Sequence, residues 1–256
     1  DVQLVAPSSN HLIMEGVTGE MSPPGNTITH TVNWTLPTQL LSANTYVIRV
    51  TDKTDSPLVV GTSAPFSVVN IDLEASYDLQ GLTDATDVFL LDSFAYVTTQ
   101  DTRDKSPELY IFDVATPSQP ALRGSLNIGH EVNKIYVRGD YAFLATNNNA
   151  SELIVVNVKD KAAPSILSQY NLPGEGNTLS IAGDSTKIYV GTANKQTGAE
   201  FYVLNISNPA ILSLLGSYEV GARVNDLAFK KMIGRGLSPV KYVYLATSHA
   251  SKELLV

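Results

Sequence analysis

The sequence contains no cysteine, which excludes a disulfide scaffold, a thiolate zinc site and a cysteine nucleophile. Charged residues are also scarce, at 16% of the chain, whereas hydrophobic residues make up 43%. This balance argues against disorder and is typical of a protein with many buried strands. No apolar run approaches the roughly 18 residues of a membrane span, so we predict no membrane-spanning segment.

Positive charge is in the minority, because 17 Lys and Arg face 25 Asp and Glu and the net charge is −8. An acidic surface repels phosphate backbones, so nucleic acid is not a predicted partner. Histidine is rare, and no two histidines have the spacing of metal ligands. The sequence also lacks a phosphate loop, a dinucleotide fingerprint and a nucleophile elbow. We therefore predict no catalytic residue, no metal site and no cofactor.

What the sequence does contain is a repeat. Four times, a strand that ends in Ala-Thr, Thr-Thr or Gly-Thr is followed by a variable loop, a glutamate and an apolar strand. The glutamates are Glu108, Glu152, Glu200 and Glu253, and their spacing is close to the roughly 40–50 residues of one four-stranded propeller blade. The repeat predicts an all-β fold, a β-propeller with blades at residues 82–128, 129–172, 173–220 and from 221 onward.

The strand after each glutamate is apolar on both faces. In the first copy, Tyr110 and Phe112 point to one side and Leu109 and Ile111 to the other. A sheet that is apolar on both faces needs cover on both faces, and blades stacked around an axis provide it. The outermost strand of each copy is more polar, as expected at an edge.

A further copy of the outermost strand, Glu74–Leu79, precedes the first full repeat. We expect it to complete the last blade and so close the ring. The fourth copy is unfinished at Val256 and the chain begins at Asp1 without a methionine, so we expect a longer natural product with further blades. A closed ring of four blades, with residues 74–79 beside 253–256, is the alternative.

The repeat resembles a known family. The pattern Glu-Leu-(Tyr/Ile)-(Ile/Val)-(Phe/Val)-(Asp/Asn)-Val followed by proline is similar to the LVIVD repeat, and the resemblance covers about residues 70–256. The best matches are Leu109–Val114, Leu153–Val158 and Phe201–Ile206. The resemblance implies a propeller of a kind found mostly on surface and secreted proteins, without a defined biochemical role. Asn157 and Asn205 stand where the family prefers aspartate.

Residues 1–69 do not follow the period. Alternating strands at Thr27–Trp34, Tyr46–Thr51 and Pro65–Val69 predict a small β-sandwich. These strands resemble a KNH-type Ig-like domain whose opening strands would lie before Asp1. Such domains precede larger modules in cell-wall and surface proteins, and Trp34 would be the core aromatic.

Recurring polar residues are the candidates for a site. Asp87, Asn133, Asn177 and Asn225 lie where the chain enters each innermost strand, and these positions converge on one end of a propeller channel. Such a ring could bind a cation, a sugar or a peptide end, or its members could cap the turns leading into the strands. We interpret the four repeated glutamates as solvated strand boundaries. The sequons at Asn33, Asn149 and Asn205 are candidate glycosylation sites.

The leading hypothesis is a non-catalytic extracellular or cell-surface protein that acts in adhesion, assembly or scaffold display. Its partners would be other surface proteins, glycans or copies of itself. One alternative is a propeller enzyme, a hydrolase or lyase with its site at the channel mouth, because one fold hosts many chemistries. Another is a subunit of an extracellular filament.

Overall fold

The computed structural model describes residues 2–6, 9–14, 43–52, 59–64, 66–68, 73–79, 84–100, 105–174, 176–193, 198–232 and 240–256. The chain divides into two compact units, Asp1–Leu73 and Glu74–Val256. Among the described residues, no helix has the length and apolar character needed to cross a membrane.

The first unit contains one antiparallel sheet. Its strands are β1 (Val2–Ala6), β2 (Ser9–Met14), β3 (Ala43–Asp52), β4 (Val59–Thr62) and β5 (Phe66–Val68), and β3 pairs with β1, β4 and β5. The strands predicted at Tyr46–Thr51 and Pro65–Val69 fall on β3 and β5, whereas Thr27–Trp34 lies outside the described residues. A second layer, which an Ig-like sandwich needs, is not shown among the described residues of this unit.

The second unit contains four sheets that we call blades 1 to 4. In blades 1 to 3, four antiparallel strands follow one another in sequence order, and blade 4 has three described strands. Their bounds are β6 (Ala85–Leu91), β7 (Phe94–Thr99), β8 (Leu109–Asp113) and β9 (Ala121–Leu126); β10 (Val132–Arg138), β11 (Tyr141–Thr146), β12 (Leu153–Asn157) and β13 (Ser165–Tyr170); β14 (Thr178–Gly183), β15 (Lys187–Thr192), β16 (Phe201–Asn205) and β17 (Ser213–Tyr218); β18 (Val224–Met232), β19 (Val240–Thr247) and β20 (Leu254–Leu255).

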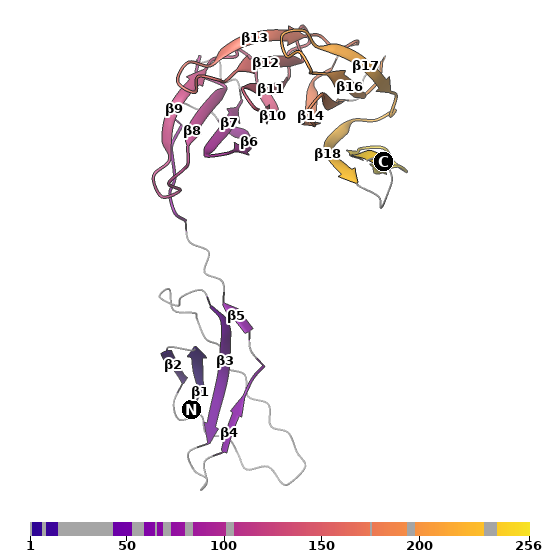
Figure 1. The fold of residues 1–256 in the computed structure, drawn as a ribbon. Coiled ribbons are helices and arrows are strands. Elements are labelled where there is room, and N and C mark those ends of the chain that lie inside the picture. The colour runs from indigo at the N-terminus through magenta and orange to yellow at the C-terminus, as the bar shows by residue number, and fades with distance from the viewer. Residues whose placement is uncertain are drawn as a thin grey trace. The chain divides into compact units, whose positions relative to one another are not determined.

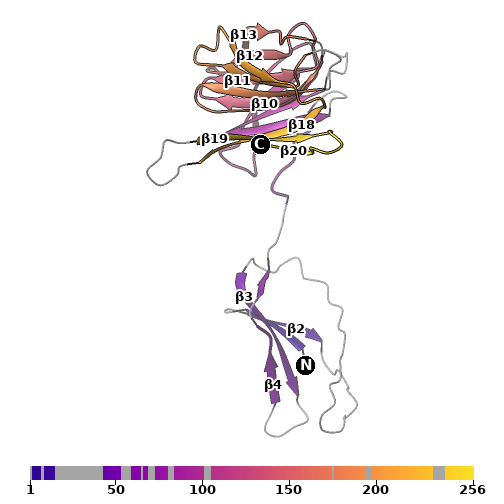
Figure 2. The same cartoon turned by 90° about the vertical axis from the view of Figure 1, so that its right-hand side faces the viewer.

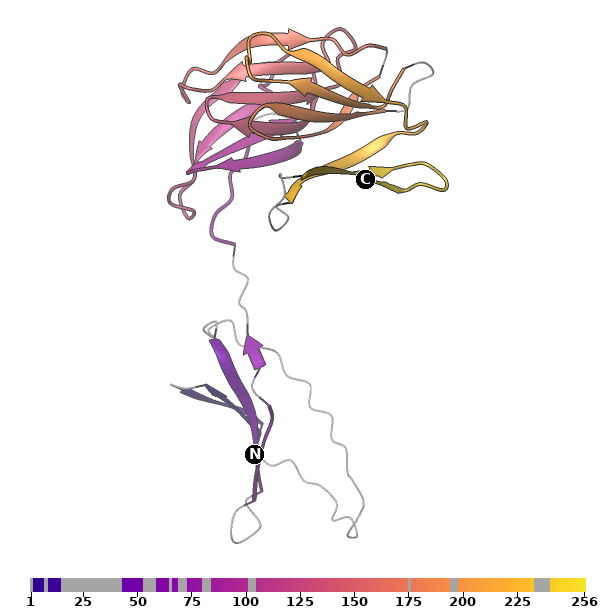
Figure 3. The same cartoon turned by 45° about the vertical axis from the view of Figure 1, so that its right-hand side comes forward.

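The blades are arranged radially, with the first strand of each innermost. Strand β6 packs on β10, β10 on β14, and β14 on β18, so the inner strands are neighbours around a common axis. Figure 1 shows the blades along an arc, with blade 1 and blade 4 at its two ends. Figure 2 shows β10 to β13 in order across blade 2, and Figure 3 shows the yellow strands of blade 4 as the terminal sheet. The predicted propeller arrangement, with four blades, is confirmed.

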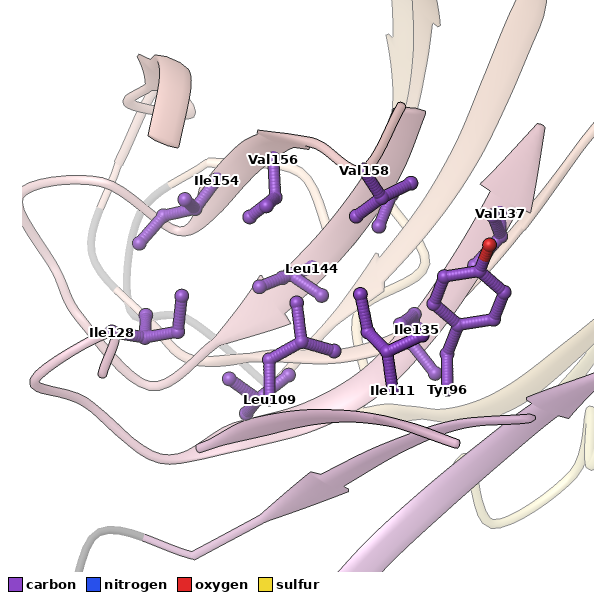
Figure 4. Close-up of a cluster of buried hydrophobic side chains, with 12 residues drawn as sticks. Tyr96, Leu109, Ile111, Ile128, Ile135, Val137, Leu144, Ile154, Val156 and Val158 are labelled. Carbon is purple, nitrogen blue, oxygen red and sulfur yellow. The ribbon is translucent and has the colours of Figure 1, made fainter. Parts of the chain in front are cut away.

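The hydrophobic core lies between the blades. Leu109 and Ile111 of blade 1 are fully buried in one cluster with Ile154 and Val156 of blade 2 (Figure 4). Tyr110 and Phe112, the alternate residues of β8, belong to a different cluster on the other face. The predicted two-sided burial of the third strand is therefore confirmed, and burying a side chain of this size contributes about 1.5–3 kcal/mol.

The segment Glu74–Leu79 does not pair with a described strand. The structure places it against the face of blade 1 that points away from blade 2. There the rings of Tyr77 and Phe112 meet edge to face, with centroids 4.7 Å apart. Leu79 packs on the cluster of Ala95, Tyr110 and Phe112. Because that apolar face has no preceding blade in the described residues, the segment covers part of it; the predicted pairing with the last blade is not seen.

In blades 1 to 3, the turn after the third strand can be made by asparagine as well as by aspartate. The side-chain oxygen Oδ1 of Asp113 accepts the N–H of Ala115 at 3.0 Å, and Asn157 accepts the N–H of Lys159 at 3.0 Å. Asn205 does the same with Ser207 at 2.9 Å. An amide oxygen makes this Asx turn as well as a carboxylate does, so the departures from the family pattern keep the same local structure.

Candidate functional site

The inner strand of every blade carries a β-bulge at its second residue. The pairing with the second strand shifts at Thr86, Asn133, Leu179 and Asn225. Asn133 and Asn225 are therefore equivalent, whereas Asp87 follows its bulge by one residue and Asn177 precedes β14. The four predicted channel-mouth residues come from three different places in the repeat. Bulges re-aim side chains, and in blades 1 and 2 the bulged residues Thr86 and Asn133 bond to the next blade.

Two members of the predicted set connect neighbouring blades. The Asn133 amide nitrogen donates to the carbonyl of Thr178 in blade 3 at 2.7 Å. Asp87 accepts the N–H of Ile135 in blade 2 at 3.0 Å and lies 3.6 Å from the ammonium of Lys134. Thr86, which the sequence analysis missed, donates its hydroxyl to the carbonyl of Val132. These side chains bridge blades rather than capping the turns of their own strands.

The other two members are exposed. Asn177 lies outside β14, and its carbonyl accepts the N–H of Ala193 at 2.9 Å. Asn225 exchanges hydrogen bonds with the hydroxyl of Ser248 at 3.0 and 3.3 Å. Asn177 and Asn225 are thus the members of the set whose side chains face solvent.

The repeated glutamates correct the interpretation as solvated strand boundaries. Glu108, Glu152 and Glu200 are buried, with exposed fractions of 2%, 0% and 0%, whereas Glu253 is exposed. A buried carboxylate loses its hydration and needs hydrogen bonds in its place. Those bonds come from the chain that leads to the next blade, as the contacts of each carboxylate show.

Each buried carboxylate accepts backbone N–H groups about 20 residues further along the chain. Glu200 Oε2 accepts from Val220 and Gly221 at 2.9 and 3.0 Å, and Glu108 Oε2 accepts from Ile128 and Gly129 at 2.6 and 3.0 Å. Glu152 Oε2 accepts from Leu172 at 2.8 Å. Gly129 and Gly221 have positive φ, 77° and 72°, which a glycine adopts without strain and which turns its N–H toward the carboxylate. Hydrogen bonds to a charged acceptor are the stronger kind. The glutamate therefore fixes the link between blades.

The threonine that ends each second strand holds the same junction from the other side. Thr146 donates its N–H to the Glu152 carbonyl at 2.9 Å and its hydroxyl to the Ser151 carbonyl at 2.9 Å. Thr247 donates in the same way to Glu253 and Lys252, at 2.9 and 2.7 Å. The Thr and Glu of the sequence repeat thus act together. They connect the second strand, the third strand and the chain that follows the fourth strand of the same blade.

A charged network joins blades 2, 3 and 4 at the turn after β14. Burial raises the pKa of Asp184, but hydrogen bonds from Lys241 and from the N–H groups of Thr186 and Lys187 outweigh it and hold the pKa at about 2. Arg138 donates to the carbonyls of Ser185 and Ile206. The Arg138 side chain therefore bonds blade 2 to blade 3.

The candidate glycosylation sites differ in exposure. Asn149 is exposed in the loop between β11 and β12, whereas Asn205 is half-buried and uses its Oδ1 for the Asx turn. Asn33 lies outside the described residues. Asn149 is the described sequon whose side chain is open to a modifying enzyme.

Two further features bear on ligand binding. In the part of the chain that the structure describes, no three His, Asp or Glu side chains gather in a way that could hold a metal ion. A hollow on blade 2 is lined by Asn157, Lys159, Asp160, Ala163 and Ser165. Its carboxylate, Asp160, accepts the N–H of Ala162 at 2.9 Å, which is a turn contact. The polar contacts found in the described residues thus hold turns and neighbouring blades together.

The fold and the repeated polar contacts define a β-propeller of four blades whose sheets are linked by a Thr–Glu junction. Residues 83–128, 129–172 and 188–220 match the family model of the LVIVD repeat. The resemblance inferred from the sequence is thereby confirmed for blades 1 to 3, and the chain carries LVIVD repeats. A comparison with curated proteins finds no match.

Proposed function

We propose that the chain is a non-catalytic extracellular or cell-surface protein that acts in adhesion, assembly or scaffold display. The observation that supports this is a row of exposed apolar side chains on the outermost strands β9, β13 and β17. We call these three strands the outer rim. Their exposed apolar residues, with exposed fractions, are Leu122 (41%), Ile166 (40%), Leu167 (39%), Leu214 (37%) and Leu215 (53%).

The row is a repeated feature. Leu122 pairs with Phe112, Ile166 with Val156 and Leu214 with Leu204, so these three residues occupy one position in successive blades. Exposed apolar residues scattered singly are ordinary, whereas these recur at one position of successive blades. An outermost strand also has a free edge of N–H and C=O groups to which an extended partner segment can add. The outer rim therefore suits contact with another protein or a glycan.

The proposal extends to the first unit, which we infer to be a KNH-type Ig-like domain. Its antiparallel sheet, with β3 in the centre, supports this, as does its position before a repeat domain. The alternative of a propeller enzyme stays a prediction that needs two carboxylates, or His130 with a carboxylate, in one polar pocket. The filament alternative stays a prediction that particle images would test.

Binding assays test the proposal. Purified protein is incubated with cells, a glycan array and immobilised copies of itself, beside the double variant Leu167→Lys/Leu215→Lys. The control is Ser118→Lys, which adds charge at an exposed turn off the rim. We expect the double variant to lose binding at least about tenfold while keeping its circular dichroism spectrum, because charge on the rim would have to be desolvated in the complex. Protein that binds none of the three, or a double variant that binds like the parent, would contradict the proposal.

A further inference from the structure

The first hairpin of blade 4 is longer than those of the other blades. In blade 2, the pairing of the first two strands ends at Arg138. The equivalent residue of blade 4 is Lys230, because each lies six residues after the buried valine that begins its inner strand. The ladder of blade 4 continues for two further pairs, which we call the hairpin extension: Lys231 with Lys241 and Met232 with Val240. The described ladders of blades 1 and 3 have no such pairs.

The hairpin extension lies in a basic part of an acidic chain. Residues 227–252 contain five of the 17 Lys and Arg and none of the 25 Asp and Glu. Three of the five, Lys230, Lys231 and Lys241, are exposed at or next to the extension. Because the whole chain carries a net charge of −8, this positive charge is local to one hairpin. Such a charge pattern indicates an anionic partner.

Two of these lysines lie directly opposite each other. Lys231 faces Lys241 across the antiparallel pair, and like charges in this arrangement are destabilising unless an anion lies near them. Asp184 of blade 3 pairs with Lys241, whereas no described carboxylate pairs with Lys231. Since the side chains of an opposed pair share one face, both lysines lie on the side toward blade 3. Their exposure therefore does not depend on any sheet beyond blade 4.

Apolar side chains lie further out along the hairpin than the lysines. Met232 and Val240 are 47% and 50% exposed and form the last described pair of the ladder. The ladders of blades 1 to 3 end before this level, so a neighbouring sheet of the same kind would leave the pair uncovered. The hairpin therefore presents apolar groups at its end and ammonium groups one and two pairs behind them.

We propose that the hairpin extension docks on a lipid surface that carries anionic headgroups. The order of the side chains favours a membrane over an acidic protein, because the apolar pair enters the boundary between headgroups and acyl chains while the ammonium groups stay among the headgroups. The attraction acts over a screening length of about 8 Å at physiological salt, so it comes from the lysines at the extension. The contact is peripheral and needs no membrane-spanning segment. It goes beyond the proposed function, because it involves no residue of the outer rim.

Sedimentation with vesicles tests the proposal on the whole chain. Vesicles that contain phosphatidylserine in phosphatidylcholine are compared with vesicles of phosphatidylcholine alone, and we expect binding to the anionic vesicles only. The double variant Lys230→Glu/Lys231→Glu should bind them at least about tenfold more weakly, because each lysine near the surface adds to the attraction. The control Lys105→Glu/Lys159→Glu makes the same change of charge at exposed positions of blades 1 and 2, and it should bind within about threefold of the parent.

A single thiol locates the contact, because the chain has no cysteine. Met232→Cys carries an environment-sensitive dye, and Ser118→Cys, at an exposed turn of blade 1, carries the same dye as a control. We expect the dye at position 232 to shift to the blue on anionic vesicles, since its surroundings become apolar, and the dye at position 118 to stay unchanged. Circular dichroism confirms that each variant keeps the parent fold.

The outcomes separate the alternatives. A parent that does not bind anionic vesicles, or a Lys230→Glu/Lys231→Glu variant that binds them as the parent does, would overturn the proposal. So would a dye at position 232 that responds to polyglutamate and not to vesicles, which would indicate an acidic protein as the partner. The rim variant Leu167→Lys/Leu215→Lys keeps the hairpin extension and adds positive charge, so it should bind vesicles at least as strongly as the parent. Failure of the outer rim and failure of the hairpin extension are therefore distinguishable.

Discussion

Blade 2 and blade 4 share one sequence pattern but differ in burial. Glu152, Leu153 and Val155 of blade 2 are buried, whereas the matching Glu253, Leu254 and Val256 of blade 4 are exposed. The difference follows from the neighbours: blade 2 has blade 3 on one side and an exit chain that donates an N–H to its glutamate. Whether a residue is buried in this fold therefore depends on contact with a neighbouring blade and not on the residue type alone.

The largest expected effect compares two leucines. Leu153→Ala removes a side chain from the packed interface, so we expect the free energy of unfolding to fall by about 2–5 kcal/mol. Leu254→Ala, at the same position of blade 4, should change it by about 0.5 kcal/mol or less because its side chain is exposed. Urea unfolding measures both free energies. Equal losses would contradict the comparison.

The glutamates give the next largest contrast. Glu200→Ala leaves the N–H groups of Val220 and Gly221 without their acceptor, and we expect a loss of about 2–3 kcal/mol. Glu253→Ala leaves no described N–H unsatisfied, so its effect should be close to zero under the same conditions. If Glu253→Ala lowered the free energy of unfolding as much as Glu200→Ala, the stabilisation by the glutamate could not come from its hydrogen bonds to the exit chain.

Space at the interface is tested with small residues. Gly191 and Ala246 occupy the same position, but a Cβ on Gly191 would approach Ser180 Oγ to 2.3 Å and Val224 Cγ1 to 2.4 Å. Gly191→Ala should therefore cost about 1–3 kcal/mol through overpacking. Ala246→Val, on the exposed face of blade 4, should be tolerated to within about 0.5 kcal/mol. Thermal unfolding of the two variants tests whether the interface at Gly191 lacks room for a Cβ.

Substitution of the two asparagines at the bulges, Asn133 and Asn225, should give a smaller difference in the free energy of unfolding. Asn133→Ala removes the hydrogen bond to the Thr178 carbonyl and should cost about 1 kcal/mol. Asn225→Ala removes a contact with exposed Ser248 and should cost nothing measurable. If both variants unfold at the parent's urea midpoint, the bridge between blades 2 and 3 contributes nothing to stability.

The smallest effect concerns pH. The pKa of Asp184 is lowered to about 2 in the folded chain, so its contribution is present above the unfolded pKa of about 3.9 and is lost as the pH falls toward 2. Asp184→Asn keeps the turn contacts but loses the ion pair with Lys241. The stability difference between parent and variant should shrink between about pH 4 and pH 2 by about 1 kcal/mol or less, and a constant difference would contradict the assignment.

Most of the second unit could be predicted from the sequence. The glutamate period and the two-sided apolar strands indicated the blades, because both express the steric need of each sheet for neighbours. The role of the glutamates could not be predicted, because their partners lie about 20 residues away and are backbone N–H groups with no sequence signature. Asp87 and Asn177 proved not to be equivalent to Asn133 and Asn225, because they lie one residue after and two residues before the bulge that all four inner strands share. The recurrence of glutamate before an apolar strand was the one signal that favoured a buried role.

Hydrogen exchange at the backbone N–H groups of Ile128, Leu172 and Val220 tests most directly whether buried glutamates fix the links between blades. All three N–H groups lie in connecting chain outside the strands and bond to the carboxylates of Glu108, Glu152 and Glu200. The account predicts that they exchange as slowly as the N–H groups of the third strands. Exchange as fast as that of Ser118, an exposed turn residue, would contradict it.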